Sequence, residues 1–376
     1  MYKEPRLLKK TKCINCGKEE TTISSFLRLC YQCLRNEFPQ LLPHIQKLHS
    51  ESRVKFNLPT QAPRTEDGVR CNVCINQCRI GIGEKGFCGI RENREGKLRP
   101  LWSQRRAASV DWYWDPLPTN CVADWVCPGG SSAGYPEFSY ADGPEYGYKN
   151  LAVFYNACSF NCLFCQNWHY RQRLSPASPT TAEELASQVD DRTSCICYFG
   201  GDPTPQIVHA LEVSRIARSR ALGKIVRICW ETNGSMNPRI LDRAAELSLS
   251  SGGCVKFDLK AWDEGVHRAL TGVSNKQTLA NFRRLSSLIE QRPDPPLLIA
   301  STLMVPGYID EEEVRSIARF ISQCNPSIPY ALLAFHPQFF FSDLPRTSRT
   351  QAERCLKAAK EMGLQRVRIG NVHLLW

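Results

Sequence analysis

The sequence lacks any apolar run of the about 18 residues that a membrane-spanning helix needs, so we expect no membrane association. The basic segment 1–12 also lacks the apolar stretch of a signal peptide. With 376 residues, the chain is long enough for one large domain and a small one. These absences favour a soluble, cytoplasmic protein.

The sequence also lacks a concentrated basic block, although its formal net charge is +11. The basic residues are dispersed, as at Arg283-Arg284, Arg366 and Arg368. A positive excess indicates an anionic partner such as an acidic protein surface or nucleic acid. The dispersal also suits an ordinary solvated surface, and it makes nucleic acid the less favoured partner.

Cysteine, by contrast, is abundant: the chain has 19 cysteines, many of them in CxxC or CxxxC groups. In a secreted chain such groups indicate disulfides, but without an export signal they favour metal binding. So many thiols indicate a reducing and anaerobic cytoplasm.

The chain divides into three segments. Residues 1–60 carry two CxxC pairs and a helical stretch at about 38–55; residues 61–150 carry a second cysteine group and a Gly-, Pro- and aromatic-rich connector; residues 151–376 alternate apolar strands with amphipathic helices. Six strands are expected: 151–157, 195–200, 225–230, 254–259, 297–304 and 330–335. Six such units indicate an α/β fold with a partial, open (β/α)6 barrel of the TIM type.

Capping signals mark several of the expected helices. Thr181 and Thr350 begin capping-box patterns, and Asn237 precedes a proline that suits the first helical position. Gly223 and Gly363 stand where helices are expected to end.

Polar and glycine residues follow the ends of the expected strands, where parallel barrels gather functional groups. The first strand leads into Cys158, Cys162 and Cys165, which can take three corners of a [4Fe–4S] cluster and leave one iron open. Later strands end at Gly200, Gly201 and Asp202, at Glu231 and Asn233, at Asp258 and Lys260, and at His336. The glycines also suit an ordinary turn, and the charged residues also suit an Asp258–Lys260 or Glu231–Lys260 ion pair.

These motifs together resemble the radical S-adenosylmethionine (SAM) superfamily, in particular relatives of pyruvate formate-lyase activating enzyme. The resemblance rests on CxxxCxxCQN, GGDPTP, ETNG, DLK and the terminal Arg368-Ile-Gly-Asn371. The upstream pattern from Cys71 to Cys88 resembles the AmmeMemoRadiSam-type or PflX-like branch. Asp202 and Glu231 depart from the Glu and Asp that are usual at their positions.

The resemblance implies a [4Fe–4S] cluster on Cys158, Cys162 and Cys165, with SAM on the open iron. Phe164 and Asn167 would contact the adenosine, Gly200, Gly201 and Asp202 the amino group, and Glu231, Asn233, Asp258, Lys260 and His336 the carboxylate and ribose. Reductive cleavage would give a 5′-deoxyadenosyl radical for hydrogen abstraction. A flavodoxin or ferredoxin would donate the electron, and a protein or peptide would be the substrate.

Two further four-cysteine sets are expected to bind metals. Cys13, Cys16, Cys30 and Cys33 form a zinc-ribbon pattern, with mononuclear iron as the alternative. Cys71, Cys74, Cys78 and Cys88 form a second set that suits zinc or iron. A single structural ion is favoured there over an auxiliary cluster.

The remaining cysteines form no further metal-binding pattern. Cys121 and Cys127 either approach the active site or stay as unpaired thiols. Six others are expected to be small core residues: Cys195, Cys197, Cys229, Cys254, Cys324 and Cys355.

Two alternatives to an activating-enzyme-like function stay open. One is a radical SAM enzyme that modifies RNA or a small molecule, with the ribbon as a docking module. The other is a non-catalytic zinc-ribbon binding protein whose barrel is a scaffold.

Overall fold

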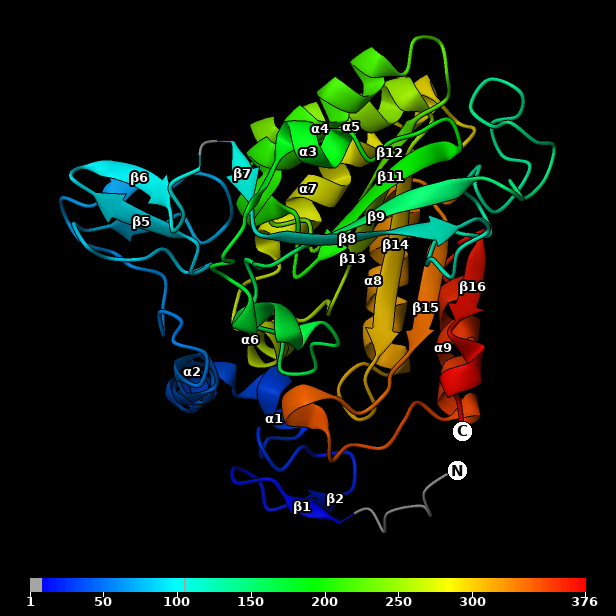
Figure 1. Ribbon diagram of the computed structural model, residues 1–376. Coiled ribbons are helices and arrows are strands. Elements are labelled where there is room, and N and C mark those ends of the chain that lie inside the picture. The colour runs from blue at the N-terminus through cyan, green and yellow to red at the C-terminus, as the bar shows by residue number, and fades with distance from the viewer. Residues whose placement is uncertain (1–8, 105) are drawn as a thin grey trace, which may run out of the picture.

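The fold was analysed in a computed structural model that describes residues 9–104 and 106–376, so most of the basic segment 1–12 lies outside the described residues. An eight-stranded sheet forms its centre, in the order β16-β15-β14-β13-β12-β11-β9-β8 (Figure 1). Seven strands run parallel, and β8 pairs with β9 antiparallel at one edge. The strands are β8 (Val110–Pro116), β9 (Lys149–Tyr155), β11 (Thr193–Gly200), β12 (Arg227–Thr232), β13 (Val255–Asp258), β14 (Leu298–Met304), β15 (Tyr330–Ala334) and β16 (Val367–Gly370).

Helices follow the parallel strands and cover the outside of the sheet (Figure 1). They are α3 (Ala182–Ala186), α4 (Ile207–Arg220), α5 (Pro238–Ser251), α6 (Glu264–Thr271), α7 (Lys276–Ser286), α8 (Glu311–Cys324) and α9 (Arg349–Glu361). Short 3-10 helices lie at Trp168–Gln172, Thr204–Gln206, Ile289–Gln291, Phe339–Phe341 and Val372–Leu374. No helix within the described ranges is long and apolar enough to cross a membrane.

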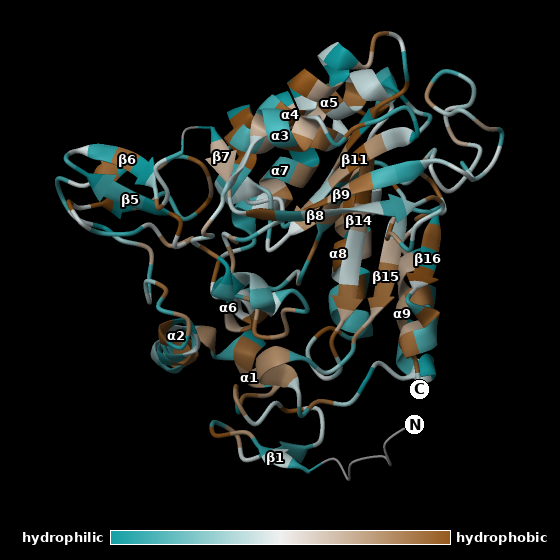
Figure 2. Ribbon diagram, in the orientation of Figure 1, coloured by the Kyte–Doolittle hydropathy of each residue, from teal (hydrophilic) through white to brown (hydrophobic). Residues whose placement is uncertain are grey.

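The expected partial barrel of six strand–helix units is confirmed, with two additional strands. Strand β16 was missed because Arg368 interrupts a short segment, and β8 because it lies within the Gly-, Pro- and aromatic-rich connector. Strand β11 is strongly hydrophobic and buried, whereas β5 is hydrophilic (Figure 2). Buried parallel strands show this continuous apolar character, which is why the six expected strands were recognisable.

Helix caps follow the expected chemistry with one correction. Thr181 makes both bonds of a capping box with Glu184, and the side chain of Asn237 accepts from Arg239 N. Helix α9 begins two residues earlier than expected: Ser348, not Thr350, is its N-cap and accepts from Gln351 N. Gly223 and Gly363 adopt the left-handed conformation just beyond α4 and α9.

The segment 117–127 fills the space between the two sheet edges, β8 and β16. It follows β8 directly, and Asp124 forms an ion pair with Arg368 of β16 at 2.7 Å. From the same segment, Cys121 reaches Lys256 of β13. The connector therefore completes the wall of the open barrel.

The N-terminal segment docks beside the C-terminal ends of the strands (Figure 1). It contains β1 (Thr11–Lys12), β2 (Glu19–Glu20), α1 (Tyr31–Asn36) and α2 (Phe38–Val54), the last of which matches the expected helical stretch. Tyr308 OH accepts from Ser24 N at 3.0 Å and donates to Leu29 O at 3.1 Å. Gly265 is needed because a Cβ there would lie 2.5 Å from Leu34 O.

Three small two-stranded sheets complete the fold. They are β3 (Val69–Arg70) with β4 (Arg79–Ile80), β5 (Arg91–Arg94) with β6 (Lys97–Pro100), and β7 (Ala107–Ala108) with β10 (Thr180–Thr181). Cys71 and Cys78 of the second four-cysteine set flank the strands of the first of these sheets.

Candidate active site and metal centres

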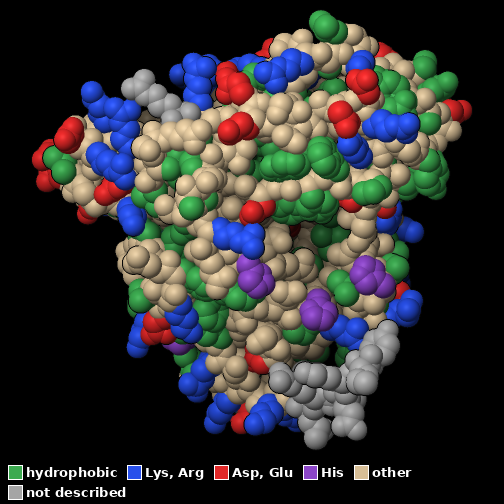
Figure 3. Space-filling model, in the orientation of Figure 1, with side chains coloured by type: hydrophobic (Ala, Val, Ile, Leu, Met, Phe, Trp, Pro, Cys, Tyr) green, Lys and Arg blue, Asp and Glu red, His purple; other side chains and the backbone are tan. Residues whose placement is uncertain are grey.

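A cavity of about 600 Å³ opens at the C-terminal ends of the barrel strands. Its lining includes Cys158, Cys162 and Cys165 and every predicted SAM contact except His336: Phe164, Asn167, Gly200, Gly201, Asp202, Glu231, Asn233, Asp258 and Lys260. A hollow is visible below β8 in Figure 3, where acidic and basic side chains are interspersed on the surface. The volume lies within the range of small-molecule sites.

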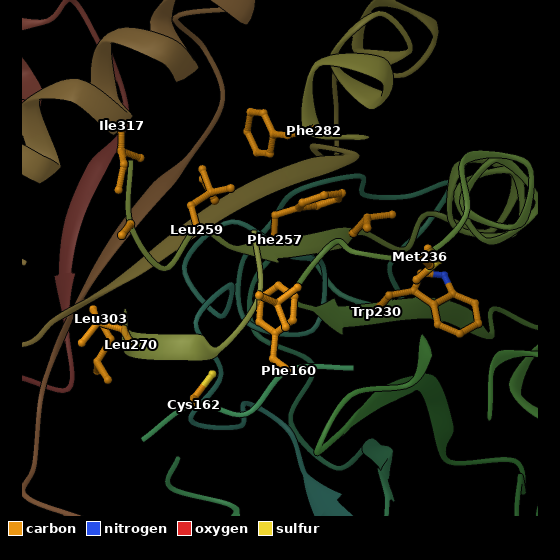
Figure 4. Close-up of a cluster of buried hydrophobic side chains, with 14 of the residues drawn as sticks. Phe160, Cys162, Trp230, Met236, Phe257, Leu259, Leu270, Phe282, Leu303 and Ile317 are labelled. Carbon is orange, nitrogen blue, oxygen red and sulfur yellow. The ribbon is translucent and has the colours of Figure 1, made fainter. Parts of the chain in front are cut away.

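The loop that carries Cys158, Cys162 and Cys165 is held by neighbouring helices. Asn161 N and Leu163 N donate to the carbonyl oxygens of Thr271 and Leu270 at the end of α6, at 2.8 and 3.0 Å. The Asn161 amide also contacts His49 and Ser52 of α2. Cys162 lies beside the buried core that contains Phe160 and Leu303 (Figure 4). The loop is therefore fixed before any ligand binds.

The surroundings of these thiols suit an anionic metal–thiolate group. Burial opposes free thiolates here, since it raises the pKa of Cys158 well above its usual value and that of Cys162 to about 12, so a bound metal would be needed to hold them deprotonated. Arg171 lines the same cavity, is 3% exposed, and has no hydrogen-bond partner for Nε or Nη1 among the described residues. A buried guanidinium without an acid is costly, and an anionic cluster would compensate its charge.

Gly200 and Gly201 are required by close backbone packing. Gly200 has φ +110°, and a Cβ there would lie 2.3 Å from Tyr155 N. A Cβ at Gly201 would lie 2.3 Å from Ala157 O. The two glycines thus bring the end of β11 against the end of β9, directly beside Cys158.

Asp202 ties the ends of two strands together. It is 3% exposed, and its carboxylate accepts from Thr204 N at 2.8 Å, Asn233 N at 2.7 Å and Thr232 OH at 3.1 Å. Burial raises its pKa, although these hydrogen bonds oppose the shift. Its carboxylate therefore positions the Thr232–Asn233 turn at the edge of the cavity.

Asn233 in turn contacts the cysteine loop. Its amide nitrogen donates to Ser159 Oγ at 2.8 Å and lies 3.7 Å from Cys158 Sγ. The Asn167 amide donates to Gly200 O at 3.1 Å, and the Phe164 ring is buried. His336, two residues beyond β15, is exposed and outside the cavity lining.

Both charged strand ends form ion pairs, one of them unexpected. Asp258 pairs with Lys260, as in one of the alternatives considered from the sequence. Glu231 pairs with Lys256 of the neighbouring strand at 3.0 Å, not with Lys260. Cys121 joins this second pair, with Lys256 Nζ 3.0 Å from its sulfur.

Sequence reasoning missed two charged residues of the cavity, Lys256 and Arg171. Lys256 had a signal: it is a charge inside an apolar strand and shares a strand face with Asp258. Arg171 had none, because its position depends on how the segment after Cys165 returns to α2.

The four sulfur atoms of Cys13, Cys16, Cys30 and Cys33 all lie within 4.8 Å of one another. The Cys13–Cys33 and Cys16–Cys30 sulfur distances are 3.8 and 3.7 Å. A tetrahedral ion with metal–sulfur bonds of about 2.3 Å has sulfur–sulfur edges of about 3.8 Å. This arrangement fits a single metal ion.

Three members of the second set, Cys71, Cys74 and Cys78, lie in the connection between β3 and β4, and Cys88 follows β4. Cys71 N donates to Cys78 O at 2.8 Å, and Cys74 pairs with Met236 in an isolated β-bridge. Burial and the other three thiols raise the pKa of Cys74 to about 12. Across the described residues, no three sulfur atoms of this set lie within 4.8 Å of one another.

The other cysteines divide between cavity and core. Cys121 lines the cavity, whereas Cys127 packs against a buried group beneath it. Five of the six expected core cysteines are buried: Cys195, Cys197, Cys229, Cys254 and Cys355. Cys324, at the end of α8, is partly exposed instead, because the helix ends there.

Comparison with known proteins agrees with this site. A family model described as the radical SAM superfamily matches residues 152–321. An uncharacterized protein of Methanocaldococcus jannaschii is 26% identical over 316 residues, which cover 82% of each chain. The pyruvate formate-lyase-activating enzyme of Streptococcus mutans is 25% identical over 207 residues, or 53% of this chain and 74% of that one.

A third relative is more similar over a shorter stretch. The isethionate sulfite-lyase activating enzyme of Desulfovibrio desulfuricans is 36% identical over 138 residues. This stretch covers 36% of the present chain and 40% of that enzyme, so the chain spans well under half of its length. The family match and the relatives named as activating enzymes support an enzyme over the alternative of a non-catalytic barrel. Residues 152–321 therefore form a radical SAM domain, and the protein is an enzyme that contains this domain.

Proposed function

We propose that this enzyme binds a [4Fe–4S] cluster through Cys158, Cys162 and Cys165 and cleaves SAM reductively for hydrogen abstraction from a protein or peptide. The observation that carries the proposal is the single cavity that three thiols share with the predicted SAM contacts. When bound, the cluster and SAM supply a 5′-deoxyadenosyl radical, which removes hydrogen from an unreactive C–H bond.

The residues around this cavity would bind and orient these groups. Arg171 would compensate negative charge at the cluster, and the Asn233 amide would donate toward Cys158 Sγ. The turn that Asp202 holds and the Asp258–Lys260 pair would contact the polar part of SAM, while Phe164 and Asn167 would flank its adenosine. Cys162 is buried and the other two thiols are partly buried, so bound SAM would displace the remaining water from the cavity.

We assign a structural zinc ion to Cys13, Cys16, Cys30 and Cys33, because their sulfur spacing suits a tetrahedral ion. The ribbon packs on the barrel through Tyr308 and Gly265. Its role would be to stabilise α1 and α2, which hold the loop of Cys158–Cys165 through His49 and Ser52.

A protein or peptide substrate is supported by relatives named as activating enzymes for isethionate sulfite-lyase and pyruvate formate-lyase. A flavodoxin- or ferredoxin-type protein would donate the electron in a reducing, anaerobic cytoplasm. The net charge of +11 suits an acidic partner surface. An RNA substrate would instead be revealed by binding that weakens steeply with salt, because phosphate contacts release counterions.

Electron paramagnetic resonance on the reduced full-length protein tests the cofactor proposal. We expect a cluster signal whose shape changes when SAM is added. Cys162→Ala should abolish that response, and Cys324→Ala serves as the matched control because Cys324 lies outside the cavity. A SAM response that survives in Cys162→Ala would contradict the assignment.

A further inference from the structure

The thiols of Cys71, Cys74, Cys78 and Cys88 differ in spacing from those of the ribbon in the same chain. The ribbon sulfurs are already at the separation of a single tetrahedral ion, whereas no three sulfurs of the second set come within 4.8 Å in the described part of the chain. A [4Fe–4S] cluster binds each thiolate to a different iron, so its ligands stand further apart than those of a single ion. The spacing therefore favours a polynuclear group.

Two guanidinium groups beside this set have no ion-pair partner among the described residues. Arg53 is 2% exposed, donates to Pro59 O at 2.6 Å and to Phe87 O, and stacks on the Phe87 ring at 3.6 Å. Arg91 donates to Cys71 Sγ at 3.8 Å. The buried Arg53 and the partly buried Arg91 gain compensation from four metal-bound thiolates, which four neutral thiols would not supply.

Three sulfurs of the set each accept a hydrogen bond from an N–H group of a different residue. Cys71 accepts from Arg91 at 3.8 Å, Cys74 from Asn76 at 3.7 Å, and Cys78 from the Phe87 backbone at 3.4 Å. Hydrogen bonds to sulfur are among the features that set the potential of an iron–sulfur cluster. The set thus already has N–H donors of the kind that surround the sulfur ligands of an iron–sulfur cluster.

The second set also lies directly behind the loop of the first cluster. The Asn76 amide that donates to Cys74 donates to Ser159 O at 2.7 Å, one residue from Cys158. Ile75 N donates to Ser235 O at 2.9 Å, and the hydroxyls of Ser235 and Ser159 lie 2.7 Å apart. A continuous network therefore joins the two groups of cysteines.

We propose that Cys71, Cys74, Cys78 and Cys88 hold a second iron–sulfur cluster that relays electrons to the cluster on Cys158, Cys162 and Cys165. A flavodoxin- or ferredoxin-type donor gives one electron to the second cluster, which passes it to the first and returns to its oxidised state. The relay rests on the proposed function, because its electron acceptor is the cluster on the first triplet. The assignment of a second cluster does not depend on the proposed function.

Metal and sulfide content of the anaerobically purified full chain tests the nuclearity. We expect about eight irons, eight sulfides and one zinc per chain if both clusters are [4Fe–4S]. About four irons with two zincs, or about five irons with four sulfides and one zinc, would overturn the proposal in favour of a single ion at the second set.

Variants separate this proposal from the proposed function. The combined Cys158→Ala, Cys162→Ala and Cys165→Ala variant should keep about half of the iron and sulfide, and adding Cys74→Ala and Cys88→Ala should remove the rest. If the first triplet held no cluster, the triple variant would match the wild type in iron and sulfide. A triple variant that has a wild-type circular dichroism spectrum but contains no sulfide would overturn the second cluster. If the triple variant does not fold, the iron and sulfide content of the wild type decides whether the second cluster exists.

The relay has its own readout. In Cys74→Ala/Cys88→Ala, reduction of the first cluster by flavodoxin should slow about tenfold or more, while reduction by dithionite should match Cys324→Ala. Unchanged reduction by flavodoxin, or equal slowing with both reductants, would overturn the relay.

Discussion

Lys256 and Cys121 meet inside the barrel, where the Lys256 ammonium lies 3.0 Å from the Cys121 sulfur. The same ammonium lies 3.0 Å from Glu231 Oε1, and the Lys256 side chain is 2% exposed. Burial raises the pKa of the Cys121 thiol although Lys256 opposes this, so the thiol stays protonated at neutral pH. A charged pair with a neutral thiol thus forms one wall of the cavity.

We predict that Glu231→Gln destabilises the protein by about 2 kcal/mol or more, because it leaves the buried Lys256 charge uncompensated. The double variant Lys256→Met/Glu231→Gln should recover most of this loss, since no buried charge remains. Urea unfolding of the wild type, Glu231→Gln, Lys256→Met and the double variant measures both effects. Simple additivity of the two substitutions would show that the pair is not coupled.

Gly200→Ala should be strongly destabilising, by more than about 2 kcal/mol, because the new Cβ meets the Tyr155 backbone at 2.3 Å. Gly223→Ala is the matched control: Gly223 also has positive φ, at +84°, but nothing lies within 4 Å of its Cβ position. That control should cost only about 1 kcal/mol. Equal losses in thermal or urea unfolding would mean that backbone conformation alone, and not close approach to β9, requires Gly200.

Stability should fall as pH falls from about 6.5 to about 4, in part through His209. Burial lowers the pKa of His209 from 6.5 to about 4, so the unfolded chain binds its proton first. The stabilising contribution is therefore complete above about pH 6.5 and is lost progressively toward pH 4, at up to about 1.4 kcal/mol per pH unit.

The comparison with His209→Gln isolates this contribution from acid effects on the metal sites. Gln can still bond the Tyr155 hydroxyl, which lies 2.9 Å from His209 Nδ1, but it does not titrate. The stability difference between wild type and variant should therefore shift against the wild type between pH 6.5 and 4. A difference that is constant with pH would exclude the His209 contribution.

Removal of the ribbon metal should unfold residues 9–36 first and leave the barrel folded. The sulfurs of Cys13, Cys16, Cys30 and Cys33 surround one position, and a small segment with little core depends on such a metal. Limited proteolysis after chelation, compared with Cys13→Ala, should cut within this segment. Resistance of the segment in both samples would show that packing on Tyr308 and Gly265 suffices.

The six main strands were predictable because each is a continuous apolar run that ends in a glycine or polar turn. Lys256 escaped notice because it lies between Val255 and Phe257 within such a run. The placement of Arg171 and the exposure of His336 depend on tertiary packing and on where β15 ends, which spacing does not encode. The sequence also could not give the sulfur separations of the second set, because Cys74 is positioned by its bridge to Met236 from a distant segment.

The central claim is that Cys158, Cys162 and Cys165 hold the cluster that cleaves SAM. The most direct test is the yield of 5′-deoxyadenosine from SAM by the anaerobically reconstituted, dithionite-reduced protein. Wild type and Cys324→Ala should form it, whereas Cys158→Ala, Cys162→Ala and Cys165→Ala should each form none above the level without protein. Formation of 5′-deoxyadenosine by any of these three variants would contradict the account.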